Sequence, residues 1–388
     1  MDLKSENGSC EVLCIGQAVI DCITRGQEPD RHRENVFRAE RIELHIGGDA
    51  VNESIALTEL GHRAAIACGV GEDPAGTLLR TELLQRGVDT RNIAVDKQLT
   101  TPIAQLVVHQ DGGRHSINSR ATMLCGYAPF ADEAGAADKN GTDCAADKNS
   151  TDVAVDKNGT VGTDRACGAA GKAGTGRASG AAGKAGTGRA NGAAGTDGTD
   201  GTGGSAENEP VPARDRMLAA MEGVRIVSLA SLFRAPLDRA EVIRALVTAA
   251  KEAGAIVSAD TKLPTFREVP VGALADVWPM VDYIFPNERE AAYYTGETDY
   301  AKMAEAFRRL GVRNVVIKAG AEGCYVSGQE GAFHLPALPV EVVDSTGAGD
   351  NFVAGFLSGV LRGESLRACA ERGRARAAEC ISRMGASG

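Results

Sequence analysis

The chain has 388 residues, 43% of them hydrophobic, which is enough to bury one large core or two modest ones without disulfides or structural metals. Its formal net charge is −10 and no run of five Lys or Arg residues occurs, so a nucleic-acid-binding surface is not expected. The ten cysteines are irregularly spaced, which predicts reduced thiols, and the polar N-terminus predicts neither a signal peptide nor a membrane span. We therefore expect a cytoplasmic protein.

The first region, residues 1–130, alternates strand and helix patterns. Short apolar runs predict strands at Glu11–Gly16 and Ala64–Gly69. Amphipathic patterns predict helices at Val51–Leu60 and Ala75–Arg86. Strands that alternate with helices favour a wound, mostly parallel sheet.

Two segments do not follow this rhythm. One is Phe37–Ile46, and the other is the pair Ile103–His109 and Arg114–Asn118, split by a turn of Asp and two Gly residues that predicts a β-hairpin. We expect these strands, within residues 17–46 and 100–120, to lie outside the main sheet.

Residues 131–212 are of low complexity, with a nine-residue repeat followed by a twelve-residue repeat. From Gly168 to Gly204 the only apolar side chain is Ala, so this stretch cannot bury enough area to offset its ordering entropy. The composition predicts a flexible insertion between residues 1–130 and 213–388, and its role is not predicted.

Residues 213–388 resume the alternation, and several strands are apolar on both faces, as expected for central parallel strands. Strands are predicted at Arg225–Leu229, Ile256–Asp260, Tyr283–Pro286, Val315–Lys318 and Gly323–Val326. Helices are predicted at Asp238–Ala253, Glu288–Thr295, Tyr300–Leu310 and Asn351–Leu361.

The strongest chemical signal is the segment Asp344-Ser345-Thr346-Gly347-Ala348-Gly349-Asp350, which runs into an apolar helix. Small residues at 347–349 let backbone N–H groups converge at the helix N-terminus, where the helix dipole favours an anion. An Asp at the end of such a turn could accept a proton from a substrate hydroxyl. The structural alternative is a tight turn in which Asp350 only caps the helix.

This segment resembles the C-terminal signature of the PfkB, or ribokinase-like, family of ATP-dependent carbohydrate kinases. Three further segments resemble that family and follow in its order: Gly47-Gly48-Asp49-Ala50-Val51-Asn52, Asn287-Glu288-Arg289-Glu290, and Lys318-Ala319-Gly320 with Gly323. The match covers the chain apart from the insertion. It implies an α/β fold with a wound, mostly parallel sheet flanked by helices, and a small β-sheet lid over the substrate, of a kind often shared in a homodimer.

The resemblance implies phosphorylation of a hydroxyl group of a sugar or sugar acid by in-line transfer from ATP. Asp350 would be the general base, with Gly347, Ala348 and Gly349 as an anion hole. ATP and its phosphates would meet Lys318, Gly320, Gly323, Asn287 and Thr346, while Glu290 and Asn287 would hold Mg²⁺ through water. The substrate would contact Asp21, Gly47, Gly48, Asn52 and Arg120. The family pattern also allows a monovalent cation such as K⁺.

For some of these residues the sequence also allows a role other than ligand binding. Lys318 could be a snorkelling lysine at a strand end, and Arg120 a solvated arginine rather than a ligand for a substrate carboxylate or phosphate. Lys262 is a further candidate contact for an anionic group. Ser231 stands where some members carry a sugar-binding carboxylate, so the sequence does not point to ribose. Neither the sugar nor the oligomeric state is predicted.

Other functions stay open at this point. A non-catalytic or regulatory small-molecule-binding protein on a kinase fold is one, because of the insertion and because the family leads us to expect a further helix near the adenine pocket beyond Gly388. A nucleoside kinase of the same family is another. A nicotinamide dehydrogenase is weaker, because Gly69-Val70-Gly71 follows a strand but Pro74 replaces the next expected Gly. Neither nucleic acid nor a membrane is an expected partner.

Overall fold

The computed structural model describes residues 10–26, 28–29, 36–108, 114–118, 213–265 and 267–383, and all of these fall in one unit of the chain. Arg120 and the predicted insertion at 131–212 lie outside the described residues. Within the described part of the chain, no helix is both long enough and apolar enough to span a bilayer.

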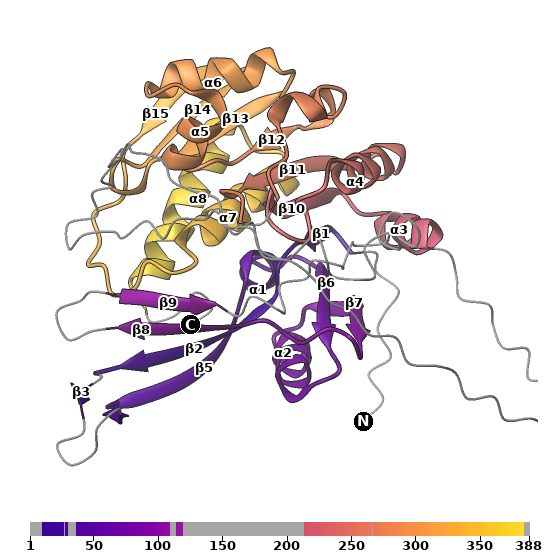
Figure 1. Cartoon of the computed structure of the whole chain (residues 1–388). Coiled ribbons are helices and arrows are strands. Elements are labelled where there is room, and N and C mark those ends of the chain that lie inside the picture. The colour runs from indigo at the N-terminus through magenta and orange to yellow at the C-terminus, as the bar shows by residue number, and fades with distance from the viewer. Residues whose placement is uncertain are drawn as a thin grey trace, which may run out of the picture. The chain divides into compact units, whose positions relative to one another are not determined.

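Nine strands form the central sheet, in the spatial order β15-β14-β13-β12-β11-β10-β1-β6-β7 (Figure 1). Their bounds are Val12–Ile15 for β1, Ala64–Gly71 for β6, Asp89–Asp96 for β7, Ile226–Leu232 for β10, Ile256–Thr261 for β11, Tyr283–Ile284 for β12, Asn314–Lys318 for β13, Cys324–Gly328 for β14 and Gly331–Leu335 for β15. The strands from β13 to β7 are parallel, as predicted, whereas β14 and β15 are antiparallel. Only the turn Gly320–Glu322 joins β13 to β14, and so short a connection joins antiparallel neighbours.

Helices cover both faces of this sheet (Figure 1). One core contains side chains from α1 (Asp49–Glu59), α2 (Pro74–Gln85), α7 (Ala348–Leu361) and α8 (Leu366–Ile381). The other contains side chains from α3 (Ala213–Met221), α4 (Ala240–Glu252), α5 (Glu288–Thr295) and α6 (Tyr300–Arg309). Strand β1 gives Val12 and Cys14 to the first core and Leu13 and Ile15 to the second, which explains why its sequence is apolar throughout.

Close packing of α7 on α8 fixes the helix that carries Asp350. A methyl group on Gly355 would lie 2.7 Å from the Arg372 carbonyl oxygen, and one on Gly373 would lie 2.8 Å from the Phe352 carbonyl oxygen. Larger residues at these two positions would push the helices apart. The two glycines therefore allow the close approach of α7 to α8.

The predicted separate small sheet is confirmed. Four strands form it in the order β5-β2-β8-β9, with bounds Arg41–Gly47, Val19–Arg25, Ile103–Val108 and Arg114–Asn118 (Figure 1). The predicted hairpin is its β8–β9 pair. The single segment expected at Phe37–Ile46 is wrong in detail, because Phe37–Arg38 forms β4 and pairs with β3 (Glu28–Pro29) in a separate two-stranded sheet.

Among the described α-helices and the strands of the central sheet, four were not predicted, namely α3, β7, β15 and α8. The small-sheet strands β2 and β3 were expected only as unspecified strands within residues 17–46. Strand β7 is a polar edge strand, and α8 carries several arginines while burying mostly small residues, so neither shows a clear apolar period. The start of α7 was placed too late: the helix begins at Ala348 rather than Asn351, so Asp350 lies inside its first turn.

Candidate active site

The predicted anion-binding turn forms at the start of α7. Gly347 is the residue before the helix, with φ of 71° in the left-handed region that glycine tolerates. Asn351 N–H donates to the Gly347 carbonyl oxygen at 2.9 Å, and Ala348 N–H donates to the Ser345 carbonyl oxygen at 3.4 Å. The amides of Gly349 and Asp350 lie in the first turn, where an α-helix offers no intrahelical acceptor. The Thr346 amide and hydroxyl both donate to Asp344 Oδ1, at 3.0 and 2.7 Å, which fixes the approach to the turn.

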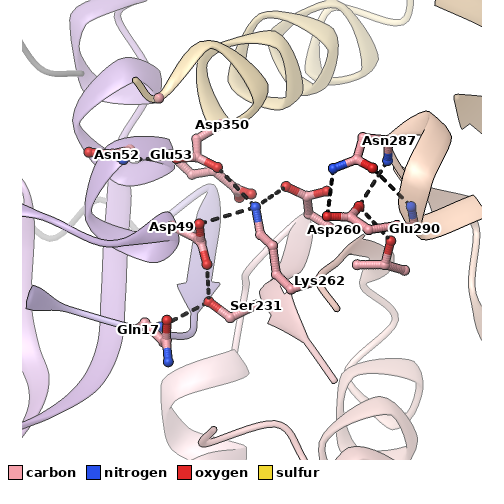
Figure 2. Close-up of polar contacts among 12 residues, drawn as sticks. Gln17, Asp49, Asn52, Glu53, Ser231, Asp260, Lys262, Asn287, Glu290 and Asp350 are labelled. Atoms are coloured by element: carbon pink, nitrogen blue, oxygen red, sulfur yellow. Dashed lines mark hydrogen bonds and ion pairs between the residues drawn. The ribbon is translucent and has the colours of Figure 1, made fainter. Parts of the chain in front are cut away.

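Asp350 points away from the helix cap and into the molecule. Its Oδ2 accepts a hydrogen bond from Asn52 Nδ2 at 2.8 Å, and its Oδ1 lies 3.3 Å from Lys262 Nζ (Figure 2). The residue is 5% exposed. The interpretation of Asp350 as a helix cap is therefore wrong: Gly347 is the N-cap residue, and the Asp350 carboxylate bonds to side chains of other elements.

Burial raises the pKa of Asp350 to about 6. The neighbouring carboxylates of Asp49 and Asp260 act in the same direction, while the Lys262 ammonium opposes them. A carboxyl with this pKa is mostly ionised at neutral pH and holds a proton more readily than an ordinary Asp, as a general base requires.

Lys262 lies at the centre of the site (Figure 2). Its Nζ is 3.1 Å from Asp49 Oδ1, 3.1 Å from Asp260 Oδ2 and 3.3 Å from Asp350 Oδ1. Burial alone would lower its pKa, but the three carboxylates outweigh burial and raise the pKa well above the usual value. Lys262 is thus an ion-pair partner of protein carboxylates, whereas the sequence had suggested a contact for an anionic ligand.

Lys318 does not snorkel to solvent. Its ammonium pairs with Asp260 Oδ1, and its side chain is 12% exposed. A methyl group on Gly349 would lie 3.5 Å from Lys318 Nζ, which places this cation beside the anion-binding turn. Asp260 therefore joins the two lysines, one near Asp350 and the other near Gly349.

Glu290 and Asn287 form the start of α5 and are tied to each other. Asn287 donates from its backbone and side chain to the two Glu290 oxygens, at 2.8 and 2.7 Å, and Thr261 Oγ1 donates to Glu290 Oε2 at 3.1 Å. Burial raises the pKa of Glu290, with Lys318 opposing the effect. A carboxylate with three donors already placed on it has little capacity left for direct ligation.

These contacts test the predicted Mg²⁺ site. No group of three His, Cys, Asp or Glu residues suited to a metal exists among the described residues. Magnesium keeps several waters and takes much of its coordination from substrate phosphates, so one hydrogen-bonded carboxylate with an amide neighbour fits a water-mediated contact. Glu290 and Asn287 are compatible with the ion in that form only.

The predicted substrate residues that the structure describes, Asp21, Gly47, Gly48 and Asn52, belong to β2, to β5 and to the start of α1. A methyl group on Gly47 would lie 2.2 Å from Asp21 Oδ2, so only glycine leaves room for the half-buried Asp21 carboxylate. Gly48 has φ of 99°, which glycine adopts without strain. Burial raises the pKa of Asp21 to about 6, assisted by the carboxylates of Asp49 and Asp344.

Gly320 and Gly323 bound the turn between β13 and β14, directly after Lys318. Both have positive φ, of 52° and 97°, and a methyl group on Gly323 would lie 2.0 Å from the Leu335 carbonyl oxygen. The conformation of the β13–β14 turn therefore explains why glycine occupies these two positions.

Sequence reasoning missed how Asp49, Ser231 and Asp260 enter the site. Ser231 Oγ donates to Asp49 Oδ2 at 2.8 Å and accepts from the Gln17 amide at 3.1 Å. The alternation Ser258-x-Asp260-x-Lys262 places these side chains on one face of β11 and its continuation, which was the available signal.

Glu53 was also missed. It is fully buried one turn after Asp49, and Ser228 Oγ donates to its Oε2 at 2.7 Å. Its Oε1 has no hydrogen-bond partner among the described residues. Burial, with the nearby Asp260 carboxylate, raises the pKa of Glu53 well above its usual value.

Comparison with known proteins identifies the family. The model of the pfkB family of carbohydrate kinases matches residues 10–128 and 199–388. The chain therefore belongs to the pfkB carbohydrate kinase family, as its signatures predicted.

Individual relatives match over shorter stretches. A cytidine kinase from Thermococcus kodakarensis is 39% identical over 129 residues, which are 31% of this chain and 46% of the relative. A 2-dehydro-3-deoxygluconokinase from Dickeya dadantii is 34% identical over 167 residues, 41% of this chain and 53% of the relative. The matched part of the chain thus spans about half the length of these curated relatives.

The fold is shared more widely. The structure of Arabidopsis thaliana ribokinase complexed with ribose and ATP matches with a TM-score of 0.66 at 18% identity, covering 97% of this chain and 94% of that one. This likeness confirms the predicted ribokinase-like fold.

Proposed function

We propose that the protein is an ATP-dependent kinase that transfers the γ-phosphoryl group of ATP to a hydroxyl group of a sugar or sugar acid. The observation that carries the proposal is the place of Asp350, whose buried carboxylate lies in the first turn of α7, beside Gly349 and Lys318. Phosphoryl transfer to an alcohol needs a proton acceptor and an anion-binding group close together, and this helix terminus offers both.

In this mechanism the acceptor oxygen bonds to the γ-phosphorus while the bond from that phosphorus to the β–γ bridging oxygen breaks. Asp350 takes the hydroxyl proton as the new bond forms. The amides of residues 347–349 and the Lys318 ammonium stabilise negative charge on the transferred group. When bound, Mg²⁺ would neutralise phosphate oxygens, held through water by Glu290 and Asn287.

The remaining roles divide between the two substrates. On the ATP side we place Gly320, Gly323 and Thr346 with Lys318. On the acceptor side we place Asp21, Gly47, Gly48 and Asn52, together with Arg120 from outside the described residues. The Asp21 carboxylate can accept hydrogen bonds from two hydroxyl groups, which suits a vicinal diol.

A nucleoside kinase is the second candidate, because the cytidine kinase relative is 39% identical over its matched residues. A ribose ring carries the same vicinal hydroxyls as a free sugar, so Asp21 suits both acceptors. A purely regulatory binding protein is disfavoured, because it would not need Asp350 and Lys318 beside one anion-binding turn.

We also propose that the small sheet acts as the lid and pairs in a homodimer. One face of this sheet exposes Ile42, Leu44, Ile103 and Ile117, which lie on its side away from Asp21. Several exposed apolar side chains on one face of a sheet are typical of an interface. Sedimentation should show a dimer that Leu44→Glu converts to monomer; a monomeric wild type would contradict the proposal.

A cytoplasmic location and an insertion outside the kinase domain stay predictions from the sequence.

The deciding experiment is an ATP-consumption screen over aldoses, ketoses, sugar acids, nucleosides and phosphosugars, in buffers containing K⁺ or Na⁺. Asp350→Asn supplies the background rate. An acceptor turned over by the wild type and not by Asp350→Asn supports the proposal and names the substrate. Equal rates for the two proteins on every acceptor would contradict it.

A further inference from the structure

We infer that Lys262 is a positioning residue for Asp350, whose carboxylate it keeps ionised and aimed toward the acceptor hydroxyl. The inference deepens the proposed function and rests on the role of Asp350 as general base. It starts from two contacts on one carboxylate, because Lys262 holds Oδ1 at 3.3 Å while Asn52 holds Oδ2 at 2.8 Å.

The hydrogen bonds of Lys262 show that its ammonium is committed to the protein. An ammonium group has three N–H donors, and Asp49, Asp260 and Asp350 present three carboxylate oxygens within 3.3 Å of Nζ. The side chain is 14% exposed. A substrate anion that bound this group would have to displace one of these carboxylates, which would leave that charge unpaired.

Asp350 needs this cation because its other neighbours are mainly carboxyls. The charged or titratable groups around it are Asp49 and Glu53 from α1, Asp260 from β11, Lys262 directly after β11, Cys380 from α8, and, one contact further, Lys318 from β13, Glu290 from α5 and Asp21 from β2. Lys262 is the cation among them that contacts Asp350 directly.

The direction of the effect follows from these charges. Burial already raises the pKa of Asp350 to about 6 with Lys262 in place. Removing an opposite charge within 4–6 Å typically raises a carboxyl pKa by about 1–3 units. A general base works in its ionised form, so activity is present above this pKa and is lost as the pH falls through it.

The test is Lys262→Met, with Lys262→Gln as a second neutral variant in case the first does not fold and Lys262→Arg to restore the charge. The direct readout is the pH titration of the Asp350 side-chain carboxyl carbon by NMR, assigned by its loss in Asp350→Asn. The kinetic readout is the acid limb of kcat/KM for ATP with cytidine, D-ribose or 2-dehydro-3-deoxygluconate, whichever the wild type phosphorylates.

Both neutral variants should move the titration midpoint and the acid limb upward by about 1–3 pH units, so that most of the lost activity returns in alkaline buffer. Lys262→Arg should stay near the wild type. Lys251→Met is the matched control, because it removes another partly buried lysine paired with an aspartate, Asp282, away from the site. It should leave both midpoints unchanged.

The outcomes separate the inference from the proposed function. An unchanged Asp350 midpoint in the neutral variants would overturn the inference, and so would a raised KM with an unchanged acid limb, which would make Lys262 a substrate contact. Near-normal kcat in Asp350→Asn would overturn the proposed function itself.

Discussion

Buried aspartates occur at both ends of the parallel strands, and they are balanced in opposite ways. Where the strands begin, Asp282 accepts from the Val257 amide at 2.9 Å and pairs with both Lys251 and Arg313. These two cations are 30% and 59% exposed, so each keeps much of its hydration. One carboxylate thus has two cations and a backbone donor, which is an arrangement suited to stability.

Where the strands end, the ratio is reversed. Lys262 alone is shared by Asp49, Asp260 and Asp350, and Asp260 is shared in turn with Lys318. An excess of buried carboxylates costs folding free energy, and a protein that selected only for stability would replace it with apolar residues. This difference supports the proposal that the second cluster serves catalysis rather than stability.

The largest expected effect comes from the substitution of Asn for a buried Asp, made at either end of the parallel strands. Asp350→Asn should lower kcat by about two to four orders of magnitude, the usual range for a general base, with a much smaller change in substrate binding. Its melting temperature should hold, because removing a buried charge beside Asp49 and Asp260 offsets the weakened bond to Lys262. Steady-state kinetics and thermal denaturation measure the two quantities.

Asp282→Asn is the control for that exchange. It removes a carboxylate that bonds to a backbone amide and to two cations, so stability should fall by about 1–3 kcal/mol while kcat stays unchanged. If Asp350→Asn instead lost stability and kept its turnover, the two ends of the sheet would not differ in kind. Asp350 would then leave the proposed mechanism.

The sequence was informative where neighbours in the chain are neighbours in space. The turn before α7 and the start of α5 are short motifs, so the sequence alone predicts their residues. Lys262 was noticed, but its partners come from α1, β11 and α7, far apart in the chain, and no local pattern reports such contacts.

Helix start points show the same limit. The sequence predicts that Asp350 directly precedes its helix, because Gly347, Ala348 and Gly349 have the composition of a loop. In the structure Ala348 and Gly349 are already helical, although a Gly has a low helix propensity. Composition alone could not place that helix start.

The smallest expected effect concerns stability against pH. The pKa of Asp21 is raised to about 6 in the folded protein, above the unfolded value of about 3.9. The folded state therefore binds this proton more tightly, so the stability it contributes is full below about pH 4 and is lost as the pH rises through about 6. Asp21→Asn should consequently stabilise the protein at pH 7.5, on the order of 1–2 kcal/mol, and should lose that advantage near pH 4.5.

Asp73 is a carboxylate whose pKa is shifted in the opposite direction. Its carboxylate accepts from the Gly76 amide at 2.7 Å and from the Thr101 amide and hydroxyl, both at 2.8 Å. Burial acts to raise its pKa, but these hydrogen bonds outweigh it and lower the pKa, so its contribution to stability is present at neutral pH and is lost in acid. Asp73→Asn should therefore destabilise the protein at pH 7.5 and approach the wild type as the pH falls. Urea denaturation from pH 4.5 to 7.5 measures the unfolding free energy of each variant relative to the wild type. This difference should rise with pH for Asp21→Asn and fall with pH for Asp73→Asn. Slopes of the same sign would contradict the prediction.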